Sequence, residues 1–187
     1  MSSSVYIAGL GVISGIGNNV EEHLAAFERE EAGMADITLF DTIHKKQLPV
    51  AEVKLGNRAL IAMTGLPEMT SRTTLLSCVA AKEALNDAAI PDLATWRTGF
   101  VSANSVGGMD KSEDFFVDFL ADTSKGKLRN VFDHECGSMT EIVADKLGLG
   151  DFMTTISTAC SSSANAIFYA ARLIKNDILD VVVAGGT

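Results

Sequence analysis

The sequence predicts an α/β fold in which a single domain over residues 1–187 is built on a mostly parallel, mixed sheet. Two observations predict it. Apolar strand-like runs alternate with helix-like segments along the chain, and the runs are continuously apolar, as in strands that are covered on both faces. A chain of 187 residues is also long enough to bury a substantial core without dividing into domains.

The first elements predicted are a strand and a helix. The apolar run Val5–Val12 predicts a buried strand that leads into glycine turns. Asn18, with Glu21 three residues later, has the spacing of a capping box at the start of a helix. This helix should reach about Glu30 and end before Gly33.

An irregular segment and a long helix follow. Residues 35–67 show poor periodicity and several Gly and Pro residues, so they predict an excursion with one short strand at 49–53. Thr70 or Ser71 can cap the next helix, which runs to about Ala89. One stripe of that helix is expected to pack closely against the sheet: Leu76, Ala80 and Ala84.

The middle of the chain predicts one strand and two helices. Gly99–Ala103 has the length and composition of a buried strand, and Asp110–Ala121 is an amphipathic helix. The apolar face of this helix consists of Phe115, Phe116, Phe119 and Leu120. A second helix, Ser138–Leu147, should end at Gly148.

The last predicted elements are a strand at 152–157, a helix at 161–176 and a strand at 179–184. The helix carries few charged residues before Arg172, so it is apolar around most of its circumference. A helix of this kind is normally buried, which predicts a central layer covered on all sides.

Composition excludes some classes of function and location. The formal charge is −9 and the pI is about 4.7, whereas nucleic-acid binding requires a basic surface. No apolar run is long enough to span a membrane, and the N-terminus lacks the basic flank of a secretory signal. Three cysteines without CxxC spacing argue against a disulfide framework, so we expect a cytoplasmic protein.

Cys160 is the strongest candidate for a catalytic residue. It lies between an apolar strand (Phe152–Ile156) and a helix rich in small residues (Ala164–Lys175). Unpaired N–H groups and the helix dipole at such a position favour the thiolate. A lone cysteine at a helix start is more often a buried structural residue, but its small neighbours Ala159, Ser161 and Ser162 would leave this sulfur approachable.

The segment around Cys160 resembles the active-site motif of β-ketoacyl synthases, the condensing enzymes of the thiolase-like superfamily. Four further segments resemble blocks of that family, in the expected order and over nearly the whole chain. The five segments are Ile7–Asn18, Arg72–Ala88, Ser105–Met109, Ser157–Ala166 and Leu179–Thr187.

The resemblance implies a thiolase-like N-terminal half, with a buried nucleophile helix and covering helices. It also implies that Cys160 takes an acyl group from the phosphopantetheine of an acyl carrier protein, and that malonyl-carrier protein then extends the chain by two carbons. Val106 falls where the family places a side chain that gates the acyl pocket. No cofactor or metal is implied, and the family pairs as homodimers through the strand before the nucleophile.

The resemblance also implies that part of the machinery is missing. The family's two catalytic histidines, a lysine and a second oxyanion donor lie in its C-terminal half, and its subunit is about twice as long. We therefore expect residues 1–187 to be the N-terminal half of a fatty-acid or polyketide synthase, inactive in condensation alone. We also expect this chain to expose sheet surface that a second half would cover, and so to self-associate.

Two other functions remain open. A Cys-dependent hydrolase or acyltransferase would need a histidine base near Cys160, and His134 is the best candidate because His23 and His44 are predicted to be solvated. A non-catalytic partner subunit that binds a carrier protein is the second, although such partners lose the nucleophile.

Two short polar runs carry weaker predictions. Lys125–Arg129 is the best candidate for a basic patch that docks an acidic carrier protein. Asp133–Cys136 gathers potential metal ligands, but in a single run without a second cluster, so we expect no metal site.

Overall fold

The computed structural model describes residues 4–90 and 92–187 and centres on a three-stranded parallel sheet. The strands are β1 (Thr98–Ala103), β2 (Phe152–Ile156) and β3 (Val181–Gly186), in the spatial order β2-β1-β3. Gly99 pairs with Phe152 on one side of β1, and Thr98 pairs with Val181 on the other. The predicted α/β class and the parallel sheet are confirmed.

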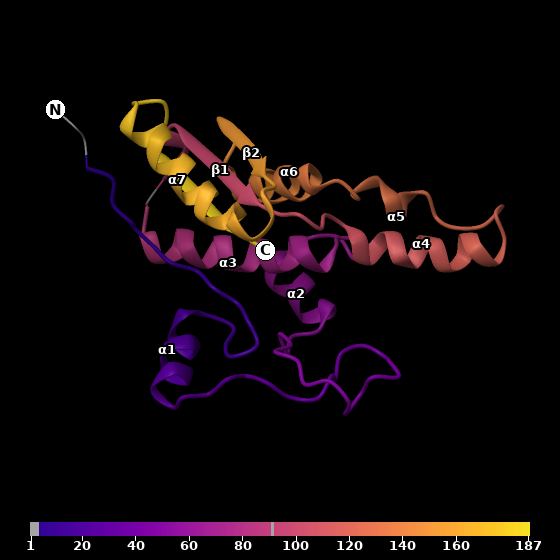
Figure 1. The fold of residues 1–187 in the computed structure, drawn as a ribbon. Helices are drawn as coiled ribbons and strands as arrows, with labels where there is room; N and C mark the ends of the chain where they lie inside the picture. Colours follow the sequence, from indigo (N-terminus) through magenta and orange to yellow (C-terminus); the bar gives the residue numbers. More distant parts are fainter. Residues whose placement is uncertain (1–3, 91) are drawn as a thin grey trace.

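Helices cover both faces of the sheet (Figure 1). The helix α7 (Ser162–Lys175) packs on one face, and α3 (Arg72–Ala88) and α6 (Cys136–Leu147) pack on the other. Successive side chains of β1 point to opposite faces. Val101 and Ala103 therefore join the cluster under α7, whereas Phe100 joins the larger cluster under α3 and α6.

Helix α3 begins as the sequence predicts. Ser71 is the N-cap, and its hydroxyl accepts a hydrogen bond from the backbone N–H of Thr74. The stripe expected to face the sheet, however, is displaced by one position. The side chains that α3 buries are those of Thr74, Leu75, Cys78, Val79 and Ala81.

The predicted strand Val5–Val12 is wrong. This segment is extended but belongs to no strand, and it runs along α3 instead (Figure 1). Carboxylates of α3 replace sheet partners: Asp87 accepts from the N–H of Leu10, and Glu83 accepts from the N–H of Val12. Gly9 and Gly11 lie directly on the helix backbone, where a Cβ would collide with the carbonyl oxygens of Ala84 and Ala80.

The capping box of the first helix is displaced by one residue. Helix α1 (Val20–Glu28) has Asn19 as its N-cap, and the Asn19 side chain accepts from the N–H of Glu22. Glu22 in turn accepts from the N–H of Asn18 at 2.7 Å. The side-chain cap predicted for Asn18 therefore forms at Asn19, whereas the carboxylate of Glu22 returns to the N–H of the residue before the cap, Asn18.

The segment at 35–67 is less irregular than predicted. It contains a helix, α2 (Asn57–Thr64), which ends at Gly65. The expected strand at 49–53 is reduced to an isolated bridge between Ala35 and Val50.

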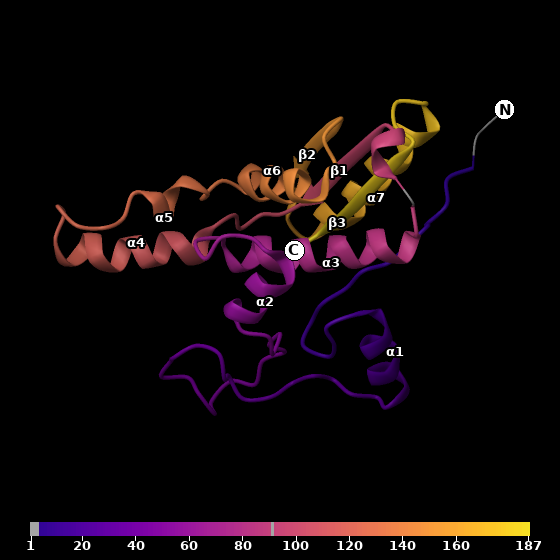
Figure 2. The same cartoon turned by 180° about the vertical axis from the view of Figure 1, so that it is seen from behind.

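An arm extends from the body of the molecule (Figures 1 and 2). It consists of α4 (Met109–Ala121), a connecting loop and the short α5 (Arg129–Phe132). Phe115 stacks on Phe119 with ring centroids 5.4 Å apart, and Phe116 meets both rings edge-on. Several large apolar side chains of the arm are exposed: Phe116, Val117, Leu120, Leu128 and Phe132.

The prediction that the last helix is buried all round is wrong for this chain. Helix α7 buries Ala166, Ala170 and Leu173 against the sheet. Its opposite face exposes Ile167, Phe168 and Tyr169. None of the helices in the described part of the chain has both the length and the apolar character needed to cross a membrane.

Candidate active site

Cys160 lies in the turn that joins β2 to α7. Residues Ala159–Ser161 form one turn of 3-10 helix, and α7 starts at the next residue. Ala159 holds a left-handed backbone with φ 54°, which is uncommon for a residue other than glycine. Cys160 is exposed, unlike the buried Cys78. The predicted position, at a strand end and a helix start, is confirmed.

Hydroxyl groups fix the shape of this turn. Ser162 Oγ accepts from the N–H of Thr158 at 2.7 Å and donates to the carbonyl of Ala159 at 2.7 Å. The Asn165 side-chain amide donates to Thr158 Oγ1 at 2.9 Å. Ser161, at the N-cap position, makes no capping bond to α7. The hydroxyl groups of this run therefore hold the turn that carries Cys160 and do not cap α7.

Cys160 opens onto a cavity of about 290 Å³ at the carboxyl ends of β1 and β3. We call it the cysteine cavity. Val106, predicted to gate an acyl pocket, also lines it. The remaining lining residues are Ala103, Asn104, Ser105, Ala159, Ser162, Ser163, Gly186 and Thr187.

Asn104 positions the loop that carries Val106. Its side chain is 1% exposed, and its Oδ1 accepts from the N–H groups of Val106 at 2.8 Å and Gly107 at 3.0 Å. Gly107 has φ 63°, and a Cβ there would collide with the carbonyl oxygen of His134. Asn104 was not predicted from the sequence, although an Asn three residues before the Gly107-Gly108 pair at a strand end is a typical turn signal.

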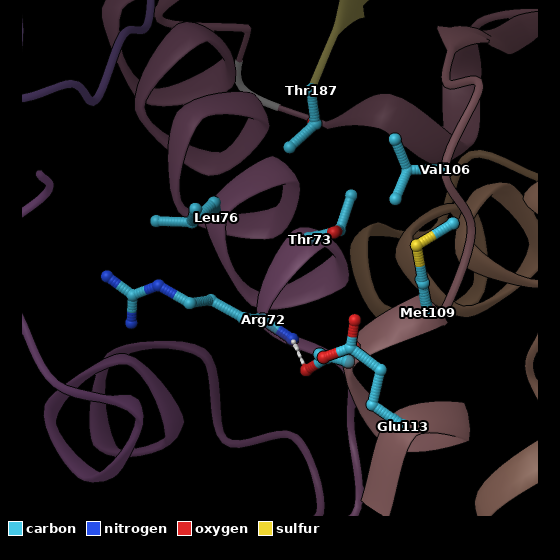
Figure 3. A pocket seen from close by; sticks show the side chains of 8 residues that line it. Arg72, Thr73, Leu76, Val106, Met109, Glu113 and Thr187 are labelled. Atoms are coloured by element: carbon cyan, nitrogen blue, oxygen red, sulfur yellow. Dashed lines mark hydrogen bonds between the residues drawn. The ribbon is translucent and has the colours of Figure 1, made fainter. Parts of the chain in front are cut away.

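A second cavity, of about 370 Å³, lies between the first turns of α3 and α4 (Figure 3). We call it the distal cavity. It shares Val106 and Thr187 with the cysteine cavity, so the two meet at these residues. Its other lining residues are Arg72, Thr73, Leu76, Met109, Asp110 and Glu113.

Asp110 joins the two helices at the distal cavity. Its Oδ2 accepts from the backbone N–H of Arg72 at 3.0 Å, at the positive end of α3. The Arg72 guanidinium points elsewhere and donates to Asn57 Oδ1 and to the carbonyl of Val53. Burial lowers the pKa of Arg72 from its usual value.

The three histidines lie outside both cavities. His134 Nδ1 is 2.8 Å from Ser112 Oγ, and the His134 carbonyl accepts from the N–H of Gly108 at 3.2 Å. His23 was predicted to be solvated but is 6% exposed, with Nε2 bonded to Ser14 Oγ and Nδ1 to the carbonyl of Asn19. His44 lies in an exposed loop as predicted. A histidine base for Cys160 is therefore not supplied by the residues that line either cavity.

The basic patch predicted to dock a carrier protein (Lys125–Arg129) lies on the arm, and the run of potential metal ligands (Asp133–Cys136) lies at the base of the arm. Residues 125–129 follow α4, and Lys125 pairs with Asp122 at 3.5 Å. The pKa of Asp122 is lowered by hydrogen bonds from Ser124, of which the bond from the side-chain hydroxyl has the larger effect and the bond from the backbone N–H the smaller. Over residues 4–90 and 92–187, no three His, Cys, Asp or Glu side chains lie close enough together to hold a metal ion.

Comparison with known proteins gives consistent matches. Residues 2–187 match the family described as "Beta-ketoacyl synthase, N-terminal domain". The chain is 28% identical over 187 residues to 3-oxoacyl-[acyl-carrier-protein] synthase 2 of Coxiella burnetii, covering 98% of this chain and 45% of that protein. It is 26% identical over 199 residues to the tetracenomycin polyketide synthase ketoacyl synthase alpha subunit of Streptomyces glaucescens, covering 98% and 45%.

Solved structures show the same fold. The ishigamide ketosynthase/chain length factor superposes with a TM-score of 0.82 at 24% identity, covering 96% of this chain and 46% of that one. A type II polyketide synthase acyl-carrier protein in complex with its ketosynthase, AntDE:AntF, gives 0.71 at 20% identity, covering 97% and 49%. The chain thus spans about 45% of the length of the curated relatives it matches.

Proposed function

The chain belongs to the β-ketoacyl synthase family and corresponds to its N-terminal domain, and from that premise we propose that it supplies the nucleophile of a carrier-protein-dependent condensing enzyme. The observation that carries this proposal is Cys160, exposed at the start of a 14-residue helix and open to a cavity. The parent pathway is fatty-acid or polyketide synthesis, the two activities named among the relatives.

The proposed first step is acyl transfer. The Cys160 thiolate attacks the carbonyl carbon of an acyl thioester on the phosphopantetheine arm of an acyl carrier protein. The new S–C bond forms, the bond to the pantetheine sulfur breaks, and that sulfur leaves as a thiol after it takes a proton. The backbone N–H of Cys160 can donate to the developing oxyanion, and the loss of one such donor typically costs about 2.7–4 kcal/mol of barrier.

The proposed second step needs groups beyond those around Cys160. Malonyl-carrier protein loses CO₂, and the resulting carbanion attacks the acyl-cysteine, forming a C–C bond and releasing the Cys160 thiolate. In the family this step uses two histidines and a lysine. Because no histidine lines the cysteine cavity, we propose that this 187-residue chain performs acyl transfer but not condensation.

The proposed roles of three other features follow from the same premise. Val106 separates the cysteine cavity from the distal cavity and would gate entry of the acyl chain. Lys125–Arg129 would dock the acidic carrier protein. Pairing of two copies through the exposed edge of β2 would follow the homodimers of the family.

Acyl transfer is tested by incubating the chain with a short acyl-carrier protein and measuring intact mass. We expect one acyl adduct on Cys160, no adduct in Cys160→Ala, and an unchanged adduct in the control Cys136→Ala. No adduct in the native chain would contradict the proposed nucleophile. Release of the free acid, abolished in His134→Ala, would instead support the Cys–His hydrolase.

Condensation is tested by adding malonyl-carrier protein to the acylated chain. We expect no 3-oxoacyl product and no CO₂ release above the rate without protein. Robust product from this chain alone would overturn the proposal that it performs acyl transfer but not condensation. Binding of carrier protein without any acyl transfer would favour the non-catalytic partner subunit.

A further inference from the structure

The loop between β1 and α4 depends on one buried side chain. Asn104 Oδ1 accepts from the backbone N–H groups of Val106 and Gly107, at 2.8 Å and 3.0 Å. Among the described residues, no other acceptor bonds to either N–H group. Bonds from an Asn side chain to the backbone two or three residues later fix the shape of a turn. The backbone of Val106 and Gly107 is therefore held by a single oxygen atom.

The Asn104 side chain is itself held firmly. It is 1% exposed, and the Asn104 N–H extends the pairing of β1 with β2 by donating to the carbonyl of Ile156 at 3.3 Å. Asn104 Nδ2 is also buried, and it finds no acceptor among the described residues. A buried donor without an acceptor is destabilising. Only the oxygen of this carboxamide therefore contributes bonds, and both of them go to the loop.

Packing alone does not hold the Val106 side chain in place. Val106 is 49% exposed, and it lies where the cysteine cavity meets the distal cavity (Figure 3). The loop is anchored beyond Val106 at Gly108, whose N–H donates to the carbonyl of His134 at 3.2 Å. The Ser105 hydroxyl accepts from Ser157 Oγ at 3.2 Å, but this bond is exposed to water and so is weaker than a buried one. The position of Val106 therefore follows from the bonds that Asn104 makes.

We propose that Asn104 is a positioning residue for acyl-chain selection at Cys160, because its carboxamide oxygen holds Val106 at the junction of the two cavities. This inference rests on the proposed function, since it concerns which acyl groups Cys160 accepts. A short chain fits within the cysteine cavity, whereas a longer chain has to pass Val106 to enter the distal cavity. Without the oxygen, the two N–H groups must turn toward water, the loop shifts, and long chains gain access.

Alkyl methanethiosulfonates measure this selection without requiring acyl transfer. The Cys160 thiolate attacks the sulfenyl sulfur, an S–S bond to the alkylthio group forms, and methanesulfinate leaves. Every variant also carries Cys136→Ala, which leaves Cys160 as the exposed thiol because Cys78 is buried. The measured quantity is the ratio of the rate constants for the octyl and the ethyl reagents, called the octyl ratio below.

Two variants of Asn104 test the oxygen. Asn104→Leu keeps the branched shape of the side chain without an acceptor, and we expect the octyl ratio to rise about tenfold from the loss of two hydrogen bonds. Asn104→Asp keeps an acceptor, and the two N–H groups stabilise its ionised form, so the octyl ratio should stay within about twofold of the native value. No rise in Asn104→Leu, or an equal rise in Asn104→Asp, would overturn the proposal.

Thr140→Val tests for an effect of stability alone. Thr140 is 2% exposed, its hydroxyl is hydrogen-bonded to that of Thr155, and neither residue lines the cysteine cavity or the distal cavity. This variant should lower the unfolding free energy and change the octyl ratio by less than about twofold, because it shares no partner with the loop. A rise equal to that of Asn104→Leu would mean that any loss of stability opens the junction, and would contradict the role of Asn104.

A double variant tests whether Asn104 acts through Val106. Val106→Ala should itself raise the octyl ratio, and adding Asn104→Leu to it should change the ratio by less than about twofold. A further tenfold rise would mean that Asn104 acts on the chain without Val106, and would contradict a positioning role. If carrier-bound acyl groups fail to load Cys160 but these ratios hold, the proposed acyl transfer fails and the role of Asn104 stands.

Discussion

At the scale of single residues, the three cysteines occupy three different environments. Cys160 is exposed at a helix start, Cys136 is partly buried at the start of α6, and Cys78 is fully buried in the middle of α3. Burial also raises the pKa of the Cys78 thiol, so the reactive thiolate is suppressed there as well as shielded. Burial therefore predicts that the reactivity of the three thiols falls in the order Cys160, Cys136, Cys78.

Alkylation of the folded chain should follow that ranking. We expect iodoacetamide at neutral pH to label Cys160 first, then Cys136, and to label Cys78 only after unfolding. Peptide mapping over a time course measures the three rates. Equal labelling of Cys160 and Cys136 would argue against an activated thiol at the start of α7.

At the scale of elements, the N-terminal segment depends on α3 rather than on the sheet. Glu83 accepts from the N–H of Val12 at 2.9 Å and from the N–H of Val20 at 2.8 Å, and so ties both ends of residues 12–20 to one helix. No other side chain from the described residues bonds to these two amides. The N-terminal segment therefore packs on α3 through two glycines, Gly9 and Gly11, and two carboxylates, of which Glu83 makes two of the three bonds and Asp87 the third.

Replacing that carboxylate should release the segment. Glu83→Leu leaves two partly buried N–H groups unpaired, so we expect a loss of about 1–3 kcal/mol in unfolding free energy. Hydrogen exchange at Val12 and Val20 should accelerate, while amides of β1 stay protected. The exposed Asn86→Ala on the same helix is the control, and equal destabilisation by both variants would contradict this role.

A second element-scale contact joins the start of β1 to the turn before β3. Arg97 donates to Asp180 and to Asp177, at 2.7 Å and 2.6 Å. The Arg97 side chain lowers the pKa of Asp180 to about 2, and the two aspartates raise the pKa of Arg97. An unpaired aspartate titrates near pH 3.9, so the contribution of this pair is present above about pH 4 and is lost as the pH falls toward 2.

The melting temperature, measured as a function of pH, tests the contribution of the Arg97–Asp180 pair. We expect Asp180→Asn to melt below the native chain at pH 7, and the gap to close as the pH falls from 4 to 2. Added salt should reduce the gap at pH 7, because the side chains are exposed. A gap that is constant from pH 7 to pH 2 would show that the charge of Asp180 is not involved.

Local signals predicted some elements well and others poorly. Ser71 and Gly148 fixed helix ends correctly, because caps depend on neighbouring residues alone. The segment Val5–Val12 reads as a strand, but whether an extended segment joins a sheet depends on partners such as Glu83, distant in sequence. Motifs singled out Cys160 and Val106, which line one cavity, whereas the bond between Asp110 and the N–H of Arg72 could not be predicted because the two residues lie 38 positions apart.

At the scale of the whole molecule, two of the surfaces where the described residues expose large apolar side chains lie on α7 and on the arm. One is the outer face of α7, with Ile167 and Phe168, and the other is the arm, with Leu120 and Phe132 at 80% and 82% exposure. Exposed apolar patches of this kind mark interaction surfaces. We therefore expect both surfaces to take part in contacts between molecules.

Self-association should follow from these surfaces. We expect the sedimentation coefficient to rise with protein concentration, and Phe168→Asp to reduce that rise without lowering the melting temperature. The control Lys175→Asp changes charge near the end of the same helix and should leave association unchanged. A concentration-independent monomer would contradict the expectation.

The parallel register of the sheet has a consequence for synthesis on the ribosome. Both strand pairings join distant parts of the chain: Gly99 of β1 pairs with Phe152 of β2, 53 residues on, and Thr98 pairs with Val181 of β3, 83 residues on. When β1 leaves the ribosome, neither of the strands that flank it has been synthesised. Its apolar side chains therefore stay exposed to solvent until β2 and β3 emerge. Pairing between such distant segments is slow and aggregation-exposed. The nascent chain should therefore bind chaperones until Val181–Gly186 has been made, and slower translation before that strand would lengthen its exposure.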